Sequence, residues 1–233
     1  LKGGEYTVKT IVTTELIKDI AEKNHIICYD VYTGFKWIAD IIRKEGGEKF
    51  IGGGEESFGY MPGAFTRDKD GVSATSLMAE IAAWVKMQNK TLYSFLKEIY
   101  AKYGFSQERM IYIVRKGLSG AQEIKAMMEE FRHNTPKEIN HSPVVLKKDY
   151  LSLEATNLQT GEKTHLDFET KSDVLQFFLA DGSKISVRPS GTEPKIKFYF
   201  EARTQMKDIN DYERAQQDAN ARIDAIIKDL KLQ

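Results

Sequence analysis

Residues 188–195 combine the side chains and the backbone freedom that suit an anion. The arginine offers a planar guanidinium fork, two hydroxyls can donate hydrogen bonds, and the glycine frees backbone N–H groups for a concave anion site. Two prolines restrict the segment and lower the entropic cost of ordering it around a ligand. The pattern predicts a phosphate-binding loop, although a rigid polar surface turn uses the same residue types. The candidate ligands are Arg188, Ser190, Gly191, Thr192 and Lys195.

A second segment, Gly52–Gly59, places two carboxylates and a hydroxyl in a glycine-rich stretch directly after a short apolar run. Glycines let the backbone turn sharply and let a ligand approach it closely. Glu55, Glu56 and Ser57 could then exchange hydrogen bonds with neighbouring hydroxyls of a sugar. A polar glycine turn without a ligand remains an equal alternative at this point.

Nucleotide-binding motifs do not fit this segment. Gly54 and Gly59 have the spacing of the P-loop glycines, but Tyr60-Met61 occupies the place of the required Lys and Ser/Thr. The dinucleotide fingerprint fails because Ser57 stands where its third glycine should be.

The charged segment 67–71, Arg-Asp-Lys-Asp-Gly, is similar in composition to a calcium loop. In that register Thr66 would be the first ligand and Leu77 the twelfth, where a glutamate is required. Calcium is therefore excluded, and a solvated turn that caps the next helix explains the segment without any ligand.

Other chemistries have little support in the sequence. The four histidines lack zinc-ligand spacing, no Gly-x-Ser-x-Gly elbow occurs, and Cys28 lies in an apolar strand pattern typical of a core residue. No metal site is therefore expected in this chain.

The composition is that of an ordinary globular protein. The 34 basic and 34 acidic side chains cancel, so no overall field favours nucleic acid or an anionic membrane. A single cysteine excludes an intrachain disulfide and favours a reducing, cytoplasmic compartment. No apolar run approaches the roughly 20 residues of a membrane-spanning helix, and the first residues carry no signal-peptide pattern.

The first hundred residues alternate between strand-like and helix-like patterns. This alternation predicts an α/β layered sheet with helices packed on it, as one domain over 1–105. The expected strands are 6–13, 26–31 and 50–51, and the expected helices are 15–24, 35–45 and two further helices that end at Gly104.

The pattern changes after Gly104, where consecutive strands indicate an α+β domain with an antiparallel sheet over 106–233. Ser119 and Gln122 predict a capping box at the start of a helix. In the last strand apolar and polar residues alternate, which predicts one buried and one solvated face. The expected strands are 110–114, 144–150, 151–158, 174–179, 184–187 and 195–201, followed by a helix over 208–230.

In this order, the motifs resemble those of the α-D-phosphohexomutase superfamily, in its phosphoglucomutase/phosphomannomutase branch. Residues 54–59 resemble the sugar-binding loop of the third domain, and 188–194 resemble the phosphate-binding loop of the fourth. Residues 32–36, Tyr-Thr-Gly-Phe-Lys, resemble the third-domain loop that helps to read the sugar, and 67–71 resemble another active-site segment of that domain.

The resemblance implies an α/β/α third domain followed by a TBP-like α+β fourth domain. The family's phosphorylated serine loop and magnesium loop belong to its first two domains and have no counterpart here. The chain is therefore expected to be the C-terminal half of such an enzyme, inactive by itself. The resemblance also implies Mg2+ and a hexose 1,6-bisphosphate activator in the whole enzyme, with the first two domains and a sugar phosphate as partners.

The resemblance implies roles for individual residues, and every one of them concerns binding or charge stabilisation. Thr33 and Gly34 would shape the sugar pocket, Glu55 and Ser57 would hold sugar hydroxyls, and Lys69 would support the transferring phosphate. Arg188, Ser190, Gly191 and Thr192, with Lys195 nearby, would hold the other phosphate. A phosphopentomutase, a hexosamine-phosphate mutase and a non-catalytic sugar-phosphate-binding module remain open as alternatives.

Overall fold

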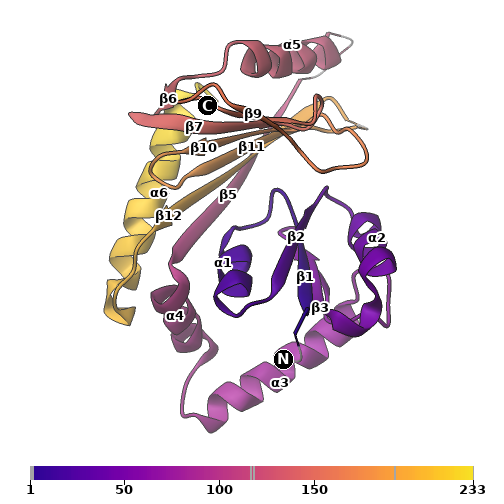
Figure 1. Cartoon of the computed structure of the whole chain (residues 1–233). Helices are drawn as coiled ribbons and strands as arrows, with labels where there is room; N and C mark the ends of the chain where they lie inside the picture. The colour runs from indigo at the N-terminus through magenta and orange to yellow at the C-terminus, as the bar shows by residue number, and fades with distance from the viewer. Residues whose placement is uncertain (1–2, 116, 118, 192, 233) are drawn as a thin grey trace. The chain divides into compact units, whose positions relative to one another are not determined.

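The computed structural model describes residues 3–115, 117, 119–191 and 193–232, and the chain divides into two compact units (Figure 1). The first unit runs to Phe105 and also includes Gln205–Tyr212, and the second contains Ser106–Thr204 and the residues from Glu213 onward. Tyr212 explains why the short returning segment belongs to the first unit. Its ring lies 5.5 Å from that of Tyr93 and 5.7 Å from that of Phe105, in edge-to-face contacts.

The first unit is built on a four-stranded sheet with the order β2-β1-β3-β4. Strand β1 pairs in parallel with both β2 and β3, whereas β4 is antiparallel to β3. The strands are β1 (Tyr6–Thr10), β2 (Ile27–Val31), β3 (Phe50–Glu55) and β4 (Gly59–Met61). The helices are α1 (Leu16–Lys23), α2 (Phe35–Glu45), the 3-10 helix η1 (Gly47–Lys49), α3 (Gly71–Met87) and α4 (Leu92–Tyr103), followed in the returning segment by the 3-10 helix η2 (Ile209–Asp211).

Helices α1 and α2 lie on opposite sides of this sheet (Figure 1). The reason is topological: the crossovers from β1 to β2 and from β2 to β3 run in opposite directions across the sheet, so the right-handed rule for parallel connections places their helices on opposite faces. Helix α2 confirms the predicted bounds 35–45, and its buried residues Phe35, Ile38 and Ile42 recur at helical spacing. These three side chains pack in one cluster with side chains of the sheet, namely Tyr6, Val8, Val31, Phe50 and Met61.

Two strand predictions in the first unit were wrong in length. Strand β1 ends at Thr10, not at residue 13, because the chain turns there and the Thr13 N–H donates to the Thr10 carbonyl at 3.0 Å. Strand β3 continues through three glycines to Glu55. Gly53 is required at its position, since a Cβ there would lie 2.8 Å from the Val8 carbonyl oxygen.

The second unit is built on an eight-stranded sheet whose main order is β5-β12-β11-β10-β7-β8-β9, with β6 paired to β7. The pairings from β12 through to β9 are antiparallel, which confirms the predicted fold class of this part of the chain. Helix α5 packs on it through Phe131, whose ring contacts those of Phe177 and Phe198. The strands are β5 (Phe105–Val114), β6 (Glu138–Ile139), β7 (Ser142–Asp149), β8 (Glu154–Asn157), β9 (Lys163–His165), β10 (Leu175–Leu179), β11 (Lys184–Pro189) and β12 (Lys195–Thr204), and the helices are α5 (Gly120–His133) and α6 (Tyr212–Asp229).

Two expectations for the second unit were wrong. The Ser119 side chain makes no capping hydrogen bond, since its backbone (φ −73°, ψ −21°) is already helical rather than extended as a cap requires. The predicted solvated face of the last strand is also buried, with Tyr199 at 7% and Glu201 at 3% exposure. Glu201 tolerates this because Lys184, on the neighbouring strand β11, lies 3.1 Å from its carboxylate.

Several predicted bounds shift by a few residues. Strand β5 begins at Phe105 rather than residue 110, and strand β8 is shorter than predicted because the chain turns at Leu153, where φ is 59°. The predicted final helix begins at Tyr212, after a 3-10 turn. Among the described helices, none is both long and apolar enough to cross a membrane.

Candidate functional site

The carboxyl ends of the three parallel strands β1, β2 and β3 lie at the same edge of the first unit's sheet. In open α/β sheets this edge is where ligands bind. Thr33 and Gly34 lie just after β2, which ends at Val31, whereas Glu55 is the last residue of β3 and Ser57 lies in the turn that follows it. The sheet therefore brings both predicted sugar-binding segments to the same edge.

Glu55 links these two segments directly. Its Oε1 accepts a short hydrogen bond from the backbone N–H of Gly34, and its Oε2 lies 3.5 Å from the Ser57 hydroxyl. Gly34 has a φ of 117°, which strains any residue with a side chain, so the glycine is needed for this contact. Oε2 of Glu55 and the Ser57 hydroxyl together provide an acceptor and a donor suited to sugar hydroxyls. Thr33 is half-buried beside Gly34.

Lys69 lies in the next connecting segment, between β4 and α3. Its Nζ is 5.5 Å from the ring centroid of Phe35, at the start of α2, and 3.5 Å from the Asp68 carboxylate. The Asp70 N–H donates to the Tyr60 carbonyl at 3.0 Å, which ties this segment to strand β4. Asp70 also caps α3, because its carboxylate accepts from the Val72 N–H at 3.0 Å. The charged segment thus starts a helix and places an exposed ammonium group close to the glycine-rich turn.

Phe58, at the tip of this turn, is fully exposed and has a φ of 64°. A bulky residue in this left-handed conformation is strained by about 1–2 kcal/mol, and an exposed ring contributes no burial to offset that cost.

We expect Phe58→Gly to leave the free energy of unfolding unchanged or to raise it by up to about 1 kcal/mol, because glycine adopts this conformation freely. Phe58→Val should lower the same free energy by about 1 kcal/mol, because a β-branched side chain is strained more in this region. Urea denaturation of both variants measures the difference. If the glycine variant is less stable than the valine variant, the backbone at Phe58 is not strained.

The second unit carries the predicted phosphate loop between β11 and β12. The loop is closed by the Ser190 N–H, which donates to the Lys195 carbonyl at 2.7 Å, and by the Arg115 N–H, which donates to the Pro194 carbonyl at 2.9 Å. Thr192, one of its predicted ligands, lies outside the described residues.

Arg188 stands at the base of this loop with its side chain half-buried. Within the described part of the chain, no hydrogen bond or ion pair engages its guanidinium group. Lys197 lies directly opposite it in the register of β11 and β12. Two cations at opposed positions repel each other, so an anion bound between them would relieve an unfavourable contact.

Lys197 is the residue that sequence analysis missed. The signal was present, because Lys195 and Lys197 share one face of a strand and Arg188 closes the partner strand of the same hairpin. Only the pairing register shows that Lys197, rather than Lys195, faces the arginine. The Lys195 Nζ instead lies 4.1 Å from the Tyr112 ring centroid and 3.8 Å from the Glu193 carboxylate.

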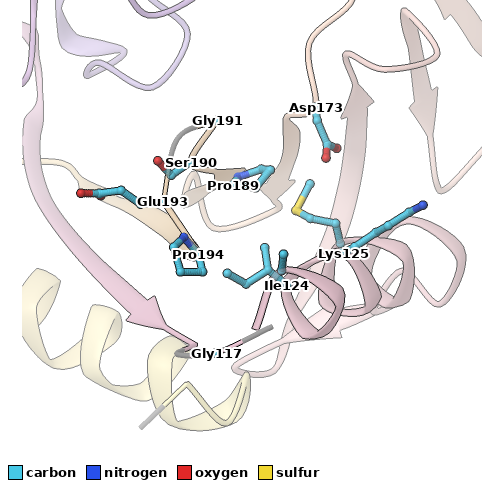
Figure 2. A pocket seen from close by; sticks show the side chains of 11 residues that line it. Gly117, Ile124, Lys125, Asp173, Pro189, Ser190, Gly191, Glu193 and Pro194 are labelled. Carbon is cyan, nitrogen blue, oxygen red and sulfur yellow. The ribbon is translucent and has the colours of Figure 1, made fainter. Parts of the chain in front are cut away.

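A pocket of about 480 Å³ lies between the phosphate loop and α5 (Figure 2). Ser190, Gly191 and Glu193 line it from the loop, whereas Ile124 and Lys125 line it from the helix. Neither Arg188 nor Lys197 is among the described residues that line it. The loop therefore has open space on its α5 side in addition to the cation pair at its base.

The described residues contain no group of three or more His, Cys, Asp or Glu side chains arranged to hold a metal ion. Cys28 is half-buried, and burial raises the pKa of its thiol to about 11. The thiol is therefore protonated at neutral pH and unsuited to act as a nucleophile.

Two family models match the chain. Residues 1–103 match the phosphoglucomutase/phosphomannomutase α/β/α domain III, and residues 122–225 match the C-terminal domain of the same family. Among curated proteins, the phosphoglucomutase of Staphylococcus aureus strain MRSA252 is 37% identical over 193 residues, which are 82% of this chain and 35% of that protein. The phosphoglucomutase of strain N315 is 36% identical over the same share of each chain.

Among solved structures, the open form of the exocytosis-sensitive phosphoprotein pp63/parafusin from Paramecium, a phosphoglucomutase, superposes with a TM-score of 0.62. The match covers 97% of this chain and 36% of that one at 18% identity, a level that supports the fold alone. This chain spans about a third of the length of the curated relatives it matches. With both of its units matched by models of one family, the chain belongs to the phosphoglucomutase/phosphomannomutase family, of which it carries domain III and the C-terminal domain.

Proposed function

We propose that this chain is the sugar-binding and phosphate-binding part of a phosphohexomutase that interconverts hexose 1-phosphates and hexose 6-phosphates. The observation that carries the proposal is the pair of Arg188 and Lys197, two cationic residues at opposed positions of β11 and β12 at the base of a glycine-containing loop. The family of the chain and its phosphoglucomutase relatives support a hexose phosphate as the ligand.

In this proposal the first unit binds the sugar and the second unit binds a phosphate group. Oε2 of Glu55 and the Ser57 hydroxyl bind hydroxyls of the sugar ring, with Thr33 and Gly34 shaping the pocket beside them. Lys69 lies near the reacting phosphate, where an ammonium group offsets developing negative charge. The unreactive phosphate binds to Arg188, to Lys197, and to the loop residues Ser190, Gly191, Thr192 and Lys195. Binding energy at this remote end positions the reacting end.

The transfer itself needs groups that this chain does not supply in the proposal. A phosphorylated serine would give its phosphoryl group to the sugar phosphate and recover the other phosphate from the resulting hexose 1,6-bisphosphate, which also acts as the activator. We propose that domains I and II of the family provide this serine and the Mg2+ site. The ion would stabilise charge on the transferring phosphoryl group. A cytoplasmic location stays a prediction from the single cysteine.

Amide NMR with two ligands tests the proposal. Inorganic phosphate should shift the Ser190 and Gly191 amides, and glucose 1-phosphate should additionally shift those of Gly34 and Glu55. Glu55→Gln should weaken glucose 1-phosphate binding about 10-fold, because a hydrogen bond to a charged group contributes about 1.5–3 kcal/mol. The affinity for inorganic phosphate should stay unchanged in this variant.

Glu48→Gln is the matched control, since Glu48 is an exposed carboxylate in η1 outside both predicted sites. It should bind both ligands as the unmodified chain does. If glucose 1-phosphate binds no more tightly than phosphate and leaves Gly34 unshifted, the sugar-binding half of the proposal is wrong.

A further inference from the structure

Glu56, between the two proposed sugar-binding residues, turns its carboxylate toward the end of strand β1. Its Oε2 lies 3.1 Å from the Thr13 hydroxyl oxygen and 3.3 Å from the Thr10 hydroxyl oxygen. These two hydroxyl oxygens lie 2.8 Å apart, so one hydroxyl donates to the other, which in turn donates to the Glu56 carboxylate. Both threonines are buried, Thr10 completely and Thr13 with 6% exposure. The proposed function assigns no role to this arrangement.

The threonines belong to a rigid part of the first unit. Next to Thr10, the buried Lys9 forms ion pairs with Glu15 at 3.0 Å and with Asp30 at 2.7 Å. The turn that follows is closed by backbone hydrogen bonds, from the Thr13 N–H to the Thr10 carbonyl and from the Ile11 N–H to Val31 of β2. The hydroxyls of Thr10 and Thr13 are therefore held in place before any ligand binds.

The sugar loop, residues 55–58 from the end of β3 to the start of β4, has few such restraints. Residues 56–58 are exposed, and Phe58 is in a strained conformation. Glu55 is tied to the loop after β2, whereas Glu56 is tied to the loop after β1. Neighbouring carboxylates thus anchor the turn at two separate places. Two anchors restrict the backbone that carries Glu55 and Ser57, which lowers the entropy lost when a sugar binds.

We propose that Thr13, together with Thr10, is a positioning residue for the sugar loop and acts by holding Glu56. The hydroxyls set the conformation of the turn, and the turn presents Glu55 and Ser57 to the hexose hydroxyls. This inference rests on the proposed function, because the sugar phosphate is the ligand that the turn would bind.

Thr13→Val tests the inference, since valine keeps the shape of threonine and removes the hydroxyl. Affinity for glucose 1-phosphate should fall about 5- to 10-fold, by loss of a charge-assisted hydrogen bond that orders the turn, and affinity for inorganic phosphate should not change. Thr13→Ser, which restores the hydroxyl, should bind glucose 1-phosphate within about 2-fold of the unmodified chain. A purely structural role for Thr13 would lower the free energy of unfolding of Thr13→Val and leave the affinity of the folded variant for glucose 1-phosphate unchanged.

A double-mutant cycle shows whether Thr13 acts through Glu56. If it does, Thr13→Val should cost little further affinity once Glu56→Gln is present, because the shared contact is already weakened. Fully additive losses would overturn the inference. Thermal unfolding of each variant identifies any that fail to fold. If Thr13→Val is one of them, Thr13→Ser is compared with the unmodified chain instead. A Ser57 amide shift equal to that of the unmodified chain then supports the inference, and a changed shift contradicts it.

The inference and the proposed function fail in different ways. If the unmodified chain prefers glucose 1-phosphate to phosphate but Thr13→Val does so equally, only the positioning role is wrong. If the unmodified chain shows no preference, the proposed function is wrong in its sugar-binding half. Hydrogen exchange of the Gly34 and Ser57 amides then decides the positioning role, since exchange that is unchanged in Thr13→Val would overturn it.

Discussion

Arg188→Ala is expected to weaken the binding of inorganic phosphate to this chain by about 10- to 100-fold. The guanidinium group is half-buried at the base of the loop and, among the described residues, has no partner in a hydrogen bond or ion pair. Its hydrogen bonding capacity is therefore available to an anion. Loss of a charged hydrogen bond costs about 1.5–3 kcal/mol, which corresponds to this range of affinity. Isothermal titration calorimetry with phosphate at fixed salt gives the measurement.

Three further variants make the result specific. Arg188→Lys keeps the charge but loses the planar fork, so its affinity should lie between those of Arg188 and Ala. Lys197→Met should also lower the affinity for inorganic phosphate, by about 3- to 10-fold, because one nearby positive charge is lost. Lys171→Met removes an exposed charge of the same unit and should have no effect. Unaltered phosphate binding by a folded Arg188→Ala protein would exclude the loop as the anion site.

Lys9→Met is expected to destabilise the first unit more than the removal of any exposed charge. Lys9 is completely buried, and its ammonium group lies between the carboxylates of Glu15 and Asp30. Removal of one partner from a buried ion pair costs about 3–5 kcal/mol, and the partial exposure of the carboxylates places the expected loss near the lower value. Urea denaturation monitored by tryptophan fluorescence measures this loss, with the exposed Lys18→Met as the control, expected within about 0.5 kcal/mol.

The same ion pairs have a defined pH dependence. Burial opposes the charged form of Lys9, but the carboxylates of Asp30 and Glu15 outweigh it, so the pKa of Lys9 is raised above its ordinary value. A raised lysine pKa stabilises the folded state fully below the unfolded pKa of about 10.4, and the stabilisation is lost as the pH rises through the folded pKa. The difference in stability between the unmodified chain and Lys9→Met should therefore be constant from pH 7 to pH 9. A difference that disappears within that interval would contradict the assignment.

Local chemistry was visible in the sequence wherever it depends on neighbouring residues. The apolar spacing of residues 35–45 specifies helix α2, and Gly46, with a φ of 85°, ends it. The composition of residues 188–195 indicates an anion loop because its donors are contiguous in the chain. The order of the motifs pointed to the family that the domain models show.

Contacts between distant segments were decided only by the tertiary structure. The bond from Gly34 to Glu55 and the anchoring of Glu56 by Thr13 depend on strand β1 lying between β2 and β3. Lys197 faces Arg188 only in the observed register, because a shift of one residue would turn it to the other side of the sheet. The alternating pattern of the last strand predicts that Glu201 is solvated, whereas in the structure it is buried beside Lys184. Periodicity reports which face of an element is apolar, whereas the partner of each polar group is set by strand pairing, which no local pattern encodes.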